Sequence, residues 1–169
     1  RARIATGFLV AGVYNHTSAG HENEQHRYDQ LDDMASTIGT AMLGINVGCA
    51  RCHDHKFDPI PQDDYYGIVA ALQKVGSVEQ EFVVPTAGKQ AVKVFLAADG
   101  GDKYGQRGVV HRLVRGDANQ KQQPAVSGTL QVLTSAQHSD TGLEDPRAEI
   151  AMWITDVEAG AGHLLARVI

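Results

Sequence analysis

The sequence has no excess of positive charge, no long hydrophobic run, and no internal repeat or low-complexity tract. Its 15 basic side chains are outnumbered by 20 acidic ones, which gives a formal charge of -5. This balance argues against a phosphate-binding surface, so we expect no nucleic-acid partner. Its apolar stretches are interrupted well before the ~18 residues that indicate a membrane helix. We therefore expect no membrane span in this segment.

What is present is the composition of an ordinary globular protein. The chain has 169 residues, of which 43% are apolar and 21% are charged. That length allows one full domain or two small ones, and it is enough to bury a core. Arg1 follows no initiator Met, and the chain stops inside the apolar run that begins at Leu164. We interpret it as a piece of a longer chain, so the missing signal peptide does not argue against export.

A long amphipathic helix is predicted for residues 23–45. Asn23 is a plausible N-cap, and the apolar residues that follow recur at spacings of three and four. That stripe consists of Leu31, Met34, Ile38, Met42 and Ile45. Asp29, Asp32 and Asp33 lie on other faces of this helix and are expected to be solvated surface. Gly39 and Gly44 weaken such a helix, which indicates that something approaches its backbone closely.

The rest of the chain is predicted to mix strands with two further helices. The second helix is expected from Asp63 or Asp64 to Leu72, with its end at Lys74 and Gly76. Three strands are then predicted, at residues 82–84, 92–96 and 109–114, because β-branched and aromatic runs alternate there with Gly- and Asp-rich turns. Arg115-Gly116-Asp117 is expected to be a turn after the last of them. A final helix is expected from Pro146 to Ile154.

The chemistry of the sequence is concentrated in Cys49-Ala50-Arg51-Cys52-His53. Cys-x-x-Cys-His is the attachment pattern of c-type haem, in which two thiols add across the porphyrin vinyl groups and the adjacent imidazole binds iron. The pattern predicts Cys49 and Cys52 as thioether anchors and His53 as the proximal iron ligand. An apolar wall around the macrocycle is predicted from residues on both sides of the motif, namely Met42, Ile45 and Val47 before it and Phe57 and Ile60 after it.

Three other interpretations of the cysteine pair remain open. A structural zinc site would use Cys49, Cys52 and His55 with a fourth ligand such as Asp58, although the usual second ligand pair is absent. A thioredoxin-like dithiol would need a buried strand before the motif, where a helix is predicted instead. A plain disulfide, or a pair of buried thiols, would leave His53 unexplained.

The sixth iron ligand is not fixed by the sequence. His55 follows His53 too closely, since two residues reach only ~7 Å and cannot pass around a porphyrin. We expect His55 to contact the cofactor in another way, for example at a propionate. His26 and His111 are the two favoured candidates for the distal position. An open position would instead allow peroxide or small-ligand chemistry, and with it an enzymatic role.

The residues around this motif resemble a known family. The resemblance extends from Asn23-Glu24-Gln25 through Leu43-Gly44-Ile45-Asn46-Val47-Gly48 and the cysteine motif to His53-Asp54-His55-Lys56-Phe57-Asp58-Pro59-Ile60 and Asp64-Tyr65-Tyr66. These segments look like the planctomycete cytochrome-c-like domain proteins, and residues 113–117 and 151–154 resemble the start of the C-terminal domain that accompanies it. The resemblance implies a large exported bacterial protein whose role is largely uncharacterised.

Together these observations predict a mainly α-helical fold, with a cytochrome-c-like unit at residues 1–76, a variable β-rich connection at 77–108 and a partial α/β segment at 109–169. The expected function is one-electron transfer through one covalent haem c, in the periplasm or outside the cell. The expected partners are other cytochromes, or further copies of this chain. The alternative is an exported, non-redox interaction or carbohydrate-associated module with a structural zinc.

Overall fold

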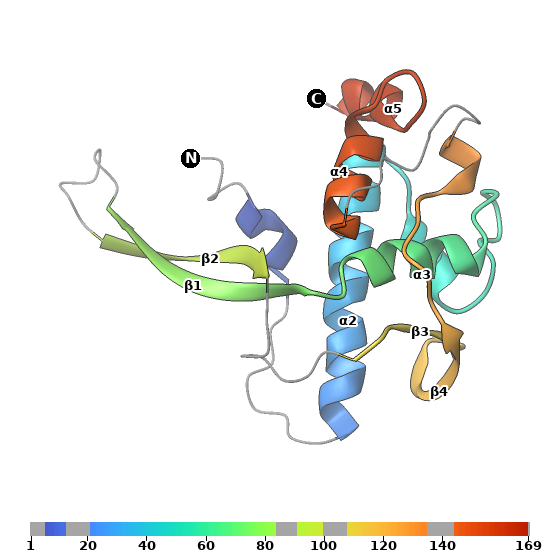
Figure 1. Ribbon diagram of the computed structural model, residues 1–169, viewed down its shortest axis with the longest axis horizontal. Coiled ribbons are helices and arrows are strands. Elements are labelled where there is room, and N and C mark those ends of the chain that lie inside the picture. The colour runs from blue at the N-terminus through green and yellow to red at the C-terminus, as the bar shows by residue number, and fades with distance from the viewer. Residues whose placement is uncertain (1–5, 13–20, 84–90, 100–107, 135–143, 169) are drawn as a thin grey trace.

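The protein is described here from a computed structural model that covers residues 6–12, 21–83, 91–99, 108–134 and 144–168. Its central element is α2 (His21–Ile38), against which most other elements are arranged (Figure 1). The predicted long helix is confirmed, but it begins at His21, so Asn23 lies inside the helix and does not cap it. The α-helix gives way at Gly39 to one π-helical turn, η2 (Gly39–Leu43).

The two glycines of this region are needed because the chain folds back on its own helix. A Cβ atom on Gly39 would lie 2.7 Å from the carbonyl oxygen of Ile45. Gly44 has a φ of 68°, a left-handed conformation that glycine adopts without steric cost, and its N–H donates to the Gly39 carbonyl. The predicted close approach is therefore confirmed, and the approaching group is the returning backbone.

A short 3-10 helix, η3 (Val47–Arg51), leads into the cysteine motif, and α3 (Gln62–Ala71) follows it. The predicted second helix is confirmed with a start at Gln62 and an end before Leu72. Nearly every residue of α3 is buried, because the helix lies between α2, α4 and the strand β3. Gly76, predicted to end this helix, belongs to the next strand.

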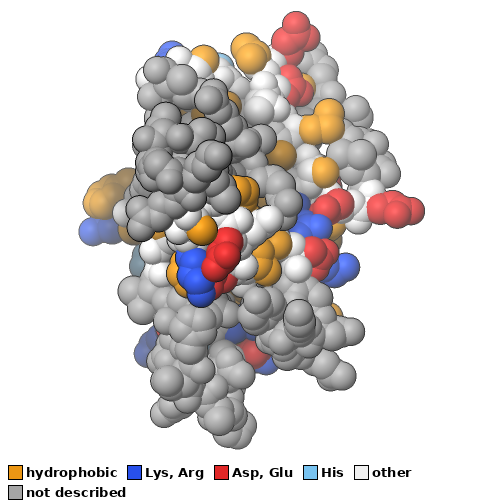
Figure 2. All heavy atoms as spheres, turned by 90° about the vertical axis from the view of Figure 1, so that its left-hand side faces the viewer, with side chains coloured by type: hydrophobic (Ala, Val, Ile, Leu, Met, Phe, Trp, Pro, Cys, Tyr) orange, Lys and Arg blue, Asp and Glu red, His pale blue; other side chains and the backbone are white. Residues whose placement is uncertain are grey.

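Two antiparallel strands, β1 (Val75–Val83) and β2 (Ala91–Asp99), form a long twisted ribbon that projects from the helices (Figure 1). Their register places Val78 opposite Leu96 and Phe82 opposite Val92. The 3-10 helix η1 (Thr6–Val10) packs along β2 at the base of the ribbon. In the view toward the tip of the ribbon, hydrophobic side chains lie beside acidic and basic ones on the described surface (Figure 2). The predicted strand at 82–84 belongs to β1 as far as Val83, and its last residue lies outside the described ranges.

A second, smaller antiparallel pair consists of β3 (His111–Val114) and β4 (Asp117–Pro124). Arg115 and Gly116 join them, with φ values of 52° and 75°. Positive φ at both positions is the geometry of a type I′ hairpin turn, so the predicted turn is confirmed. The chain continues through η5 (Gln131–Leu133), α4 (Pro146–Thr155) and α5 (Gly162–Val168).

The prediction of a mainly α-helical fold is wrong, because the protein is mixed α/β with two two-stranded antiparallel sheets beside its helices. Two features of the sequence concealed the strands. The segment Asp117–Pro124 is almost entirely polar, and it is a strand because the tight turn pairs it with β3. β1 begins at Val75, directly after α3, where the sequence favours the end of a helix.

One hydrophobic cluster joins these elements. Its largest fully buried side chains include Trp153 from α4, Tyr65 and Tyr66 from α3, Leu31 from α2 and Leu113 from β3. Within the described ranges, no helix is both long and apolar enough to cross a membrane, as the sequence predicts.

Candidate functional site: the cysteine loop

The cysteine loop, residues 47–61, begins with the short helix η3 and ends where α3 starts. Helix η3 directs both cysteines toward solvent. Val47 and Ala50 are completely buried, whereas Cys49 and Cys52 are exposed. In a 3-10 helix, residues three positions apart lie on the same face, so burying Val47 and Ala50 places the two cysteines together on another face. Neither cysteine is in a disulfide. The spacing of the motif therefore gives two accessible thiols on one turn of chain.

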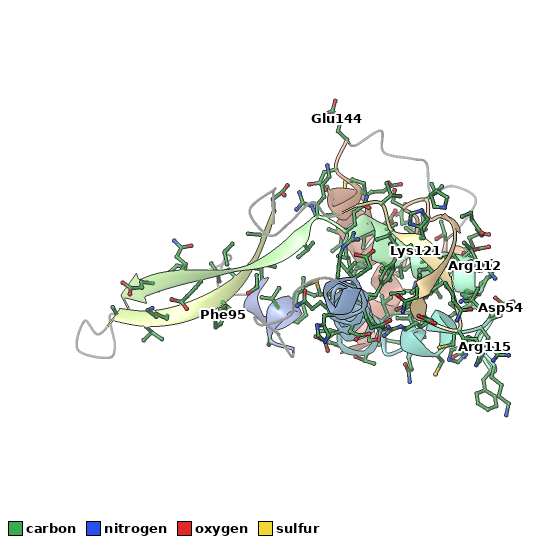
Figure 3. All side chains as sticks on the ribbon, turned by 90° about the horizontal axis from the view of Figure 1, so that it is seen from below. Asp54, Phe95, Arg112, Arg115, Lys121 and Glu144 are labelled. Carbon is green, nitrogen blue, oxygen red and sulfur yellow. The ribbon has the colours of Figure 1, made fainter. Side chains whose placement is uncertain are left out.

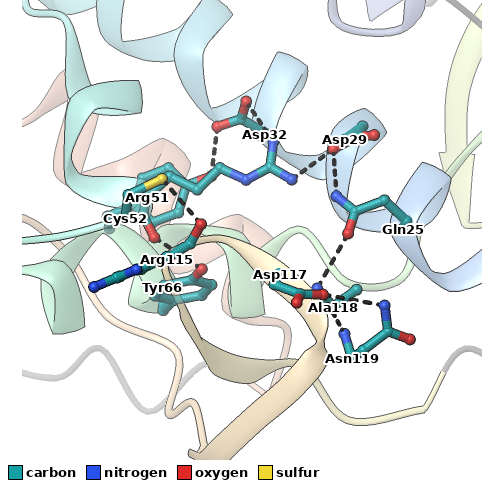
Figure 4. Close-up of polar contacts among 11 residues, drawn as sticks. Gln25, Asp29, Asp32, Arg51, Cys52, Tyr66, Arg115, Asp117, Ala118 and Asn119 are labelled. Carbon is teal, nitrogen blue, oxygen red and sulfur yellow. Dashed lines mark hydrogen bonds and ion pairs between the residues drawn. The ribbon is translucent and has the colours of Figure 1, made fainter.

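The turn of the β3–β4 hairpin lies directly against Cys52. The Cys52 thiol donates to the carbonyl oxygen of Arg115 at 3.4 Å (Figure 4). A Cβ atom on Gly116 would lie 3.1 Å from the Cys52 Sγ and 3.2 Å from the Arg51 Nε. Glycine suits position 116 for two reasons. It adopts the positive φ of the turn without steric cost, and it leaves room for the side chains of Cys52 and Arg51. The turn that the sequence predicts is part of the wall of the cysteine site.

His53 is oriented by the backbone that follows it. Its Nδ1 lies 2.6 Å from the carbonyl oxygen of Asp54. A carbonyl can only accept, so Nδ1 carries the proton and Nε2 is the nitrogen with a free lone pair. Metal-binding imidazoles commonly have one ring nitrogen hydrogen-bonded in this way, while the other nitrogen binds the metal. The side chain is exposed, so Nε2 is accessible.

His55 has a structural position in the loop. Its Nδ1 accepts hydrogen bonds from the backbone N–H groups of Asp58, at 2.9 Å, and Phe57, at 3.3 Å. The His55 side chain is only 6% exposed, and the Asp58 carboxylate lies 3.4 Å from the same nitrogen. Nδ1 therefore fixes the turn over residues 55–58. Phe57, predicted to shield a cofactor, is 83% exposed, with the Lys56 ammonium over its ring.

Arg51, between the two cysteines, is the anchor of the loop that sequence reasoning missed. Its guanidinium binds Asp29 and Asp32 of α2, the latter at 3.1 Å (Figure 4). The two aspartates were expected to be solvated surface. Burial works against the charge of Arg51, but the hydrogen bond to Asp29 and the charge of Asp32 outweigh it and raise its pKa. The available signal was the three-residue spacing of the aspartates, which places both on one helix face.

Two tyrosines complete this polar layer beneath the cysteines. Tyr65 donates to Asp32, and Tyr66 donates to the Arg51 carbonyl oxygen at 3.0 Å. Their rings meet edge to face, with centroids 5.0 Å apart. Burial raises the pKa of both phenols, and for Tyr65 the neighbouring Asp32 raises it further. Both tyrosines are therefore neutral hydrogen-bond donors at ordinary pH.

Gln62 joins the loop to α3 and β3. Its side-chain amide donates to the carbonyl oxygens of Arg51, at 2.8 Å, and Leu113, at 3.1 Å, and its own oxygen accepts from Arg112. The backbone N–H of Gln62 donates to the Asp54 carboxylate at 2.8 Å, so the loop caps the start of α3. The cysteine loop is therefore fixed from α2, α3 and the hairpin at once.

The other predicted site residues lie on separate elements. The side chain of Met42 lines a cavity together with Leu72 and Ile150, and the cysteines and His53 are not among its lining residues. His111 is the first residue of β3, at the end of the strand away from the turn at Arg115, and its Nδ1–H donates to the carbonyl oxygen of Val109. His26 lies on α2, three residues before the Asp29 that binds Arg51.

These positions give a divided answer on haem. The exposed thiols and the Nε2 of His53 are the groups that would attach a haem covalently and bind its iron. The expected apolar wall is not assembled around them, because Val47 and Ile60 are in the core, Met42 lines another cavity and Phe57 points into solvent. Figure 3 shows Asp54 and Arg115 at the end of the molecule opposite to Phe95 on the ribbon. In the ranges the structure describes, no three His, Cys, Asp or Glu side chains are grouped to hold a metal ion, which leaves the zinc alternative without a preformed site.

Comparison with known proteins finds a similarity that includes this loop. No curated protein and no solved structure matches the chain. A family model matches the part of the chain that contains α2, the cysteine loop and α3, and this match does not identify a cytochrome-c domain. Residues 1–77 match the family model PSCyt2, a planctomycete-type domain described as a protein of unknown function (DUF1549).

Proposed function

We propose that this protein is an exported electron carrier in which Cys49 and Cys52 bind one haem c covalently and His53 supplies the proximal iron ligand. The observation that carries the proposal is the pairing of two exposed, unbridged thiols with an imidazole whose Nε2 is presented. The alternative uses of a cysteine pair do not require an oriented histidine directly after the second thiol.

The residues of the chain would hold the group from one side. Cys49 and Cys52 would form the two thioether bonds, and the Asp54 carbonyl would keep the ring of His53 in the tautomer that leaves Nε2 available. Arg51, held by Asp29 and Asp32, fixes the backbone between the two cysteines. When bound, haem supplies reversible one-electron chemistry at iron.

A rigid attachment loop suits this role because electron transfer is favoured when the surroundings of the metal change little between oxidation states. The loop is tied to α2 through Arg51, to α3 through Gln62 and to the hairpin through Cys52. A single haem carries one electron, so further conduction would require partner cytochromes or other copies of this chain. Covalent attachment occurs after export, and we therefore place the protein in the periplasm or outside the cell.

The test is production of the chain in a host that exports it and contains the haem-attachment machinery. We expect an intact mass increased by one haem and a pyridine haemochrome spectrum typical of two thioether bonds. The Cys49→Ser and Cys52→Ser double variant should lose both signals, whereas Ser36→Ala, on α2, should keep them. A wild-type chain with the bare polypeptide mass would refute the proposal, and bound zinc would favour the non-redox module.

The sixth ligand can be assigned on the same sample. Replacement of His26 or His111 by Gln should convert a low-spin, six-coordinate spectrum to a high-spin one if that residue binds iron. A wild-type spectrum that is already high-spin would point to an open site and to small-ligand chemistry.

A further inference from the structure

A second site lies away from the cysteine loop, in an apolar cavity of about 530 Å³. Its walls come from η1, the junction of α2 with the π-helical turn η2, the base of the β1–β2 ribbon, α4 and α5. Leu9, Met42, Ala98, Ile150 and Leu165 represent these elements in order. Its volume falls within the ~300–1,000 Å³ typical of small-molecule sites.

The shape and chemistry of the walls favour an aliphatic ligand. The described lining residues are mostly Leu, Ile, Val, Ala and Met, and none of them is aromatic. Flat ring ligands are commonly held by aromatic side chains through stacking, which this cavity does not offer. Exposure of apolar side chains to water costs free energy in proportion to the exposed area. A flexible hydrocarbon chain bound in the cavity would remove this exposed area from water.

The polar groups of the cavity define the kind of head group that would fit. Arg147 binds Asp145 through Nε and Nη2, and its Nη2 also lies 3.3 Å from Asp99. Asp99 and Arg147 are the charged residues in the described lining, and their charges are opposite, so neither an anionic nor a cationic head group is favoured. Nη1 of Arg147 is the donor that these bonds leave for a neutral oxygen.

We propose that this cavity binds the hydrocarbon chain of a neutral single-chain lipid, such as a monoacylglycerol. The hydrocarbon chain of the lipid would lie among the aliphatic side chains, and an oxygen of its head group would accept a hydrogen bond from Arg147. This site is independent of the haem proposal, because its lining residues and those of the cysteine loop differ.

Trp153 provides an internal reporter for this site. It is the single tryptophan of the chain, is fully buried on α4, and lies between Ile150 and Ile154, which both line the cavity. We expect a monoacylglycerol with a brominated chain to quench its fluorescence saturably, and native mass spectrometry to show one lipid per chain. The fatty acid and the alkyl trimethylammonium salt of the same chain length should bind at least tenfold more weakly.

A matched pair of variants tests the position. Ala151 lines the cavity from α4, so Ala151→Phe should weaken binding at least tenfold, whereas Ala166→Phe, on an exposed position of α5 outside the lining, should not. Circular dichroism would confirm that both variants are folded. The proposal is overturned if no quenching occurs, if the charged lipids bind as well as the neutral one, if Ala166→Phe weakens binding equally, or if a second copy of the chain occupies the cavity.

Discussion

The thiol of Cys52 donates to the carbonyl oxygen of Arg115, 63 residues further along the chain. This bond places a strained hairpin turn on the second cysteine of the motif, since Arg115 is the one described non-glycine residue with a positive φ. The environment of the cysteine loop is therefore set partly by a segment outside the residues that match the family. Substitutions in the turn should therefore alter the conformation and stability of the cysteine loop.

The first prediction concerns Gly116. Replacement by Ala should destabilise the protein by about 1–2 kcal/mol, because a residue with a Cβ atom is disfavoured at positive φ, and here it also meets Cys52 and Arg51. Urea unfolding would measure the loss. Gly128→Ala is the control, since no atom lies within 4 Å of its added Cβ. Equal stability of the two variants would show that the turn does not press on the loop.

Removal of the Arg51 guanidinium should weaken the loop more than the loss of a surface ion pair. Arg51→Ala leaves the Asp32 carboxylate partly buried with Tyr65 as a partner, and we expect about 2 kcal/mol of destabilisation. Lys93→Ala, which breaks the exposed pair with Glu79, should leave stability unchanged. Thermal unfolding of both variants in low and high salt provides the comparison. A loss of stability in Lys93→Ala as large as that in Arg51→Ala would contradict the role of Arg51.

The buried tyrosines predict a loss of stability in alkaline solution. Burial raises the pKa of Tyr28, Tyr65 and Tyr66 above the unfolded value of 10.0. A raised folded pKa means that the unfolded chain releases its protons first, so the stabilisation is complete below about pH 10 and is lost as the pH rises above it. A pH titration followed by tyrosinate absorbance should show these three phenols ionising at a higher pH in the folded protein than in the protein unfolded by urea.

A single-residue test of this linkage is Tyr65→Phe. The variant should show a shallower fall in stability above about pH 10, because one of the raised phenols is absent. An unchanged slope would mean that Tyr65 ionises as easily in the folded chain as in the unfolded one.

The loop also predicts a capping effect at α3. Asp54 accepts the backbone N–H of Gln62, the first residue of the helix, so Asp54→Ala should cost about 1 kcal/mol. Asp54→Asn keeps an acceptor oxygen and should retain most of the stability. Urea denaturation of the two variants tests this. If Asp54→Asn loses as much stability as Asp54→Ala, the hydrogen bond to Gln62 is not the cause of the loss.

Local chemistry in the sequence was sufficient for several elements. The apolar stripe from Leu31 to Ile38 predicts α2, Pro146 predicts the start of α4, and Arg115-Gly116 predicts the tight turn. Each depends on a few neighbouring residues, through helical periodicity or a fixed φ. The cysteine motif likewise gives the spacing of its reactive groups without reference to the rest of the chain.

Other features depend on partners distant in sequence, which no local pattern encodes. β4 is polar and becomes a strand only through pairing with β3, and Arg51 is an anchor only because α2 brings Asp29 and Asp32 to it. Met42 belongs to the predicted apolar stripe, yet its side chain lines a cavity with α4 and α5. The sequence by itself determined the three longest helices, α2, α3 and α4, and the positions of the reactive groups along the chain. The tertiary structure decided which of those groups meet, because burial and ion pairing depend on distances between elements that are set only when the core is packed.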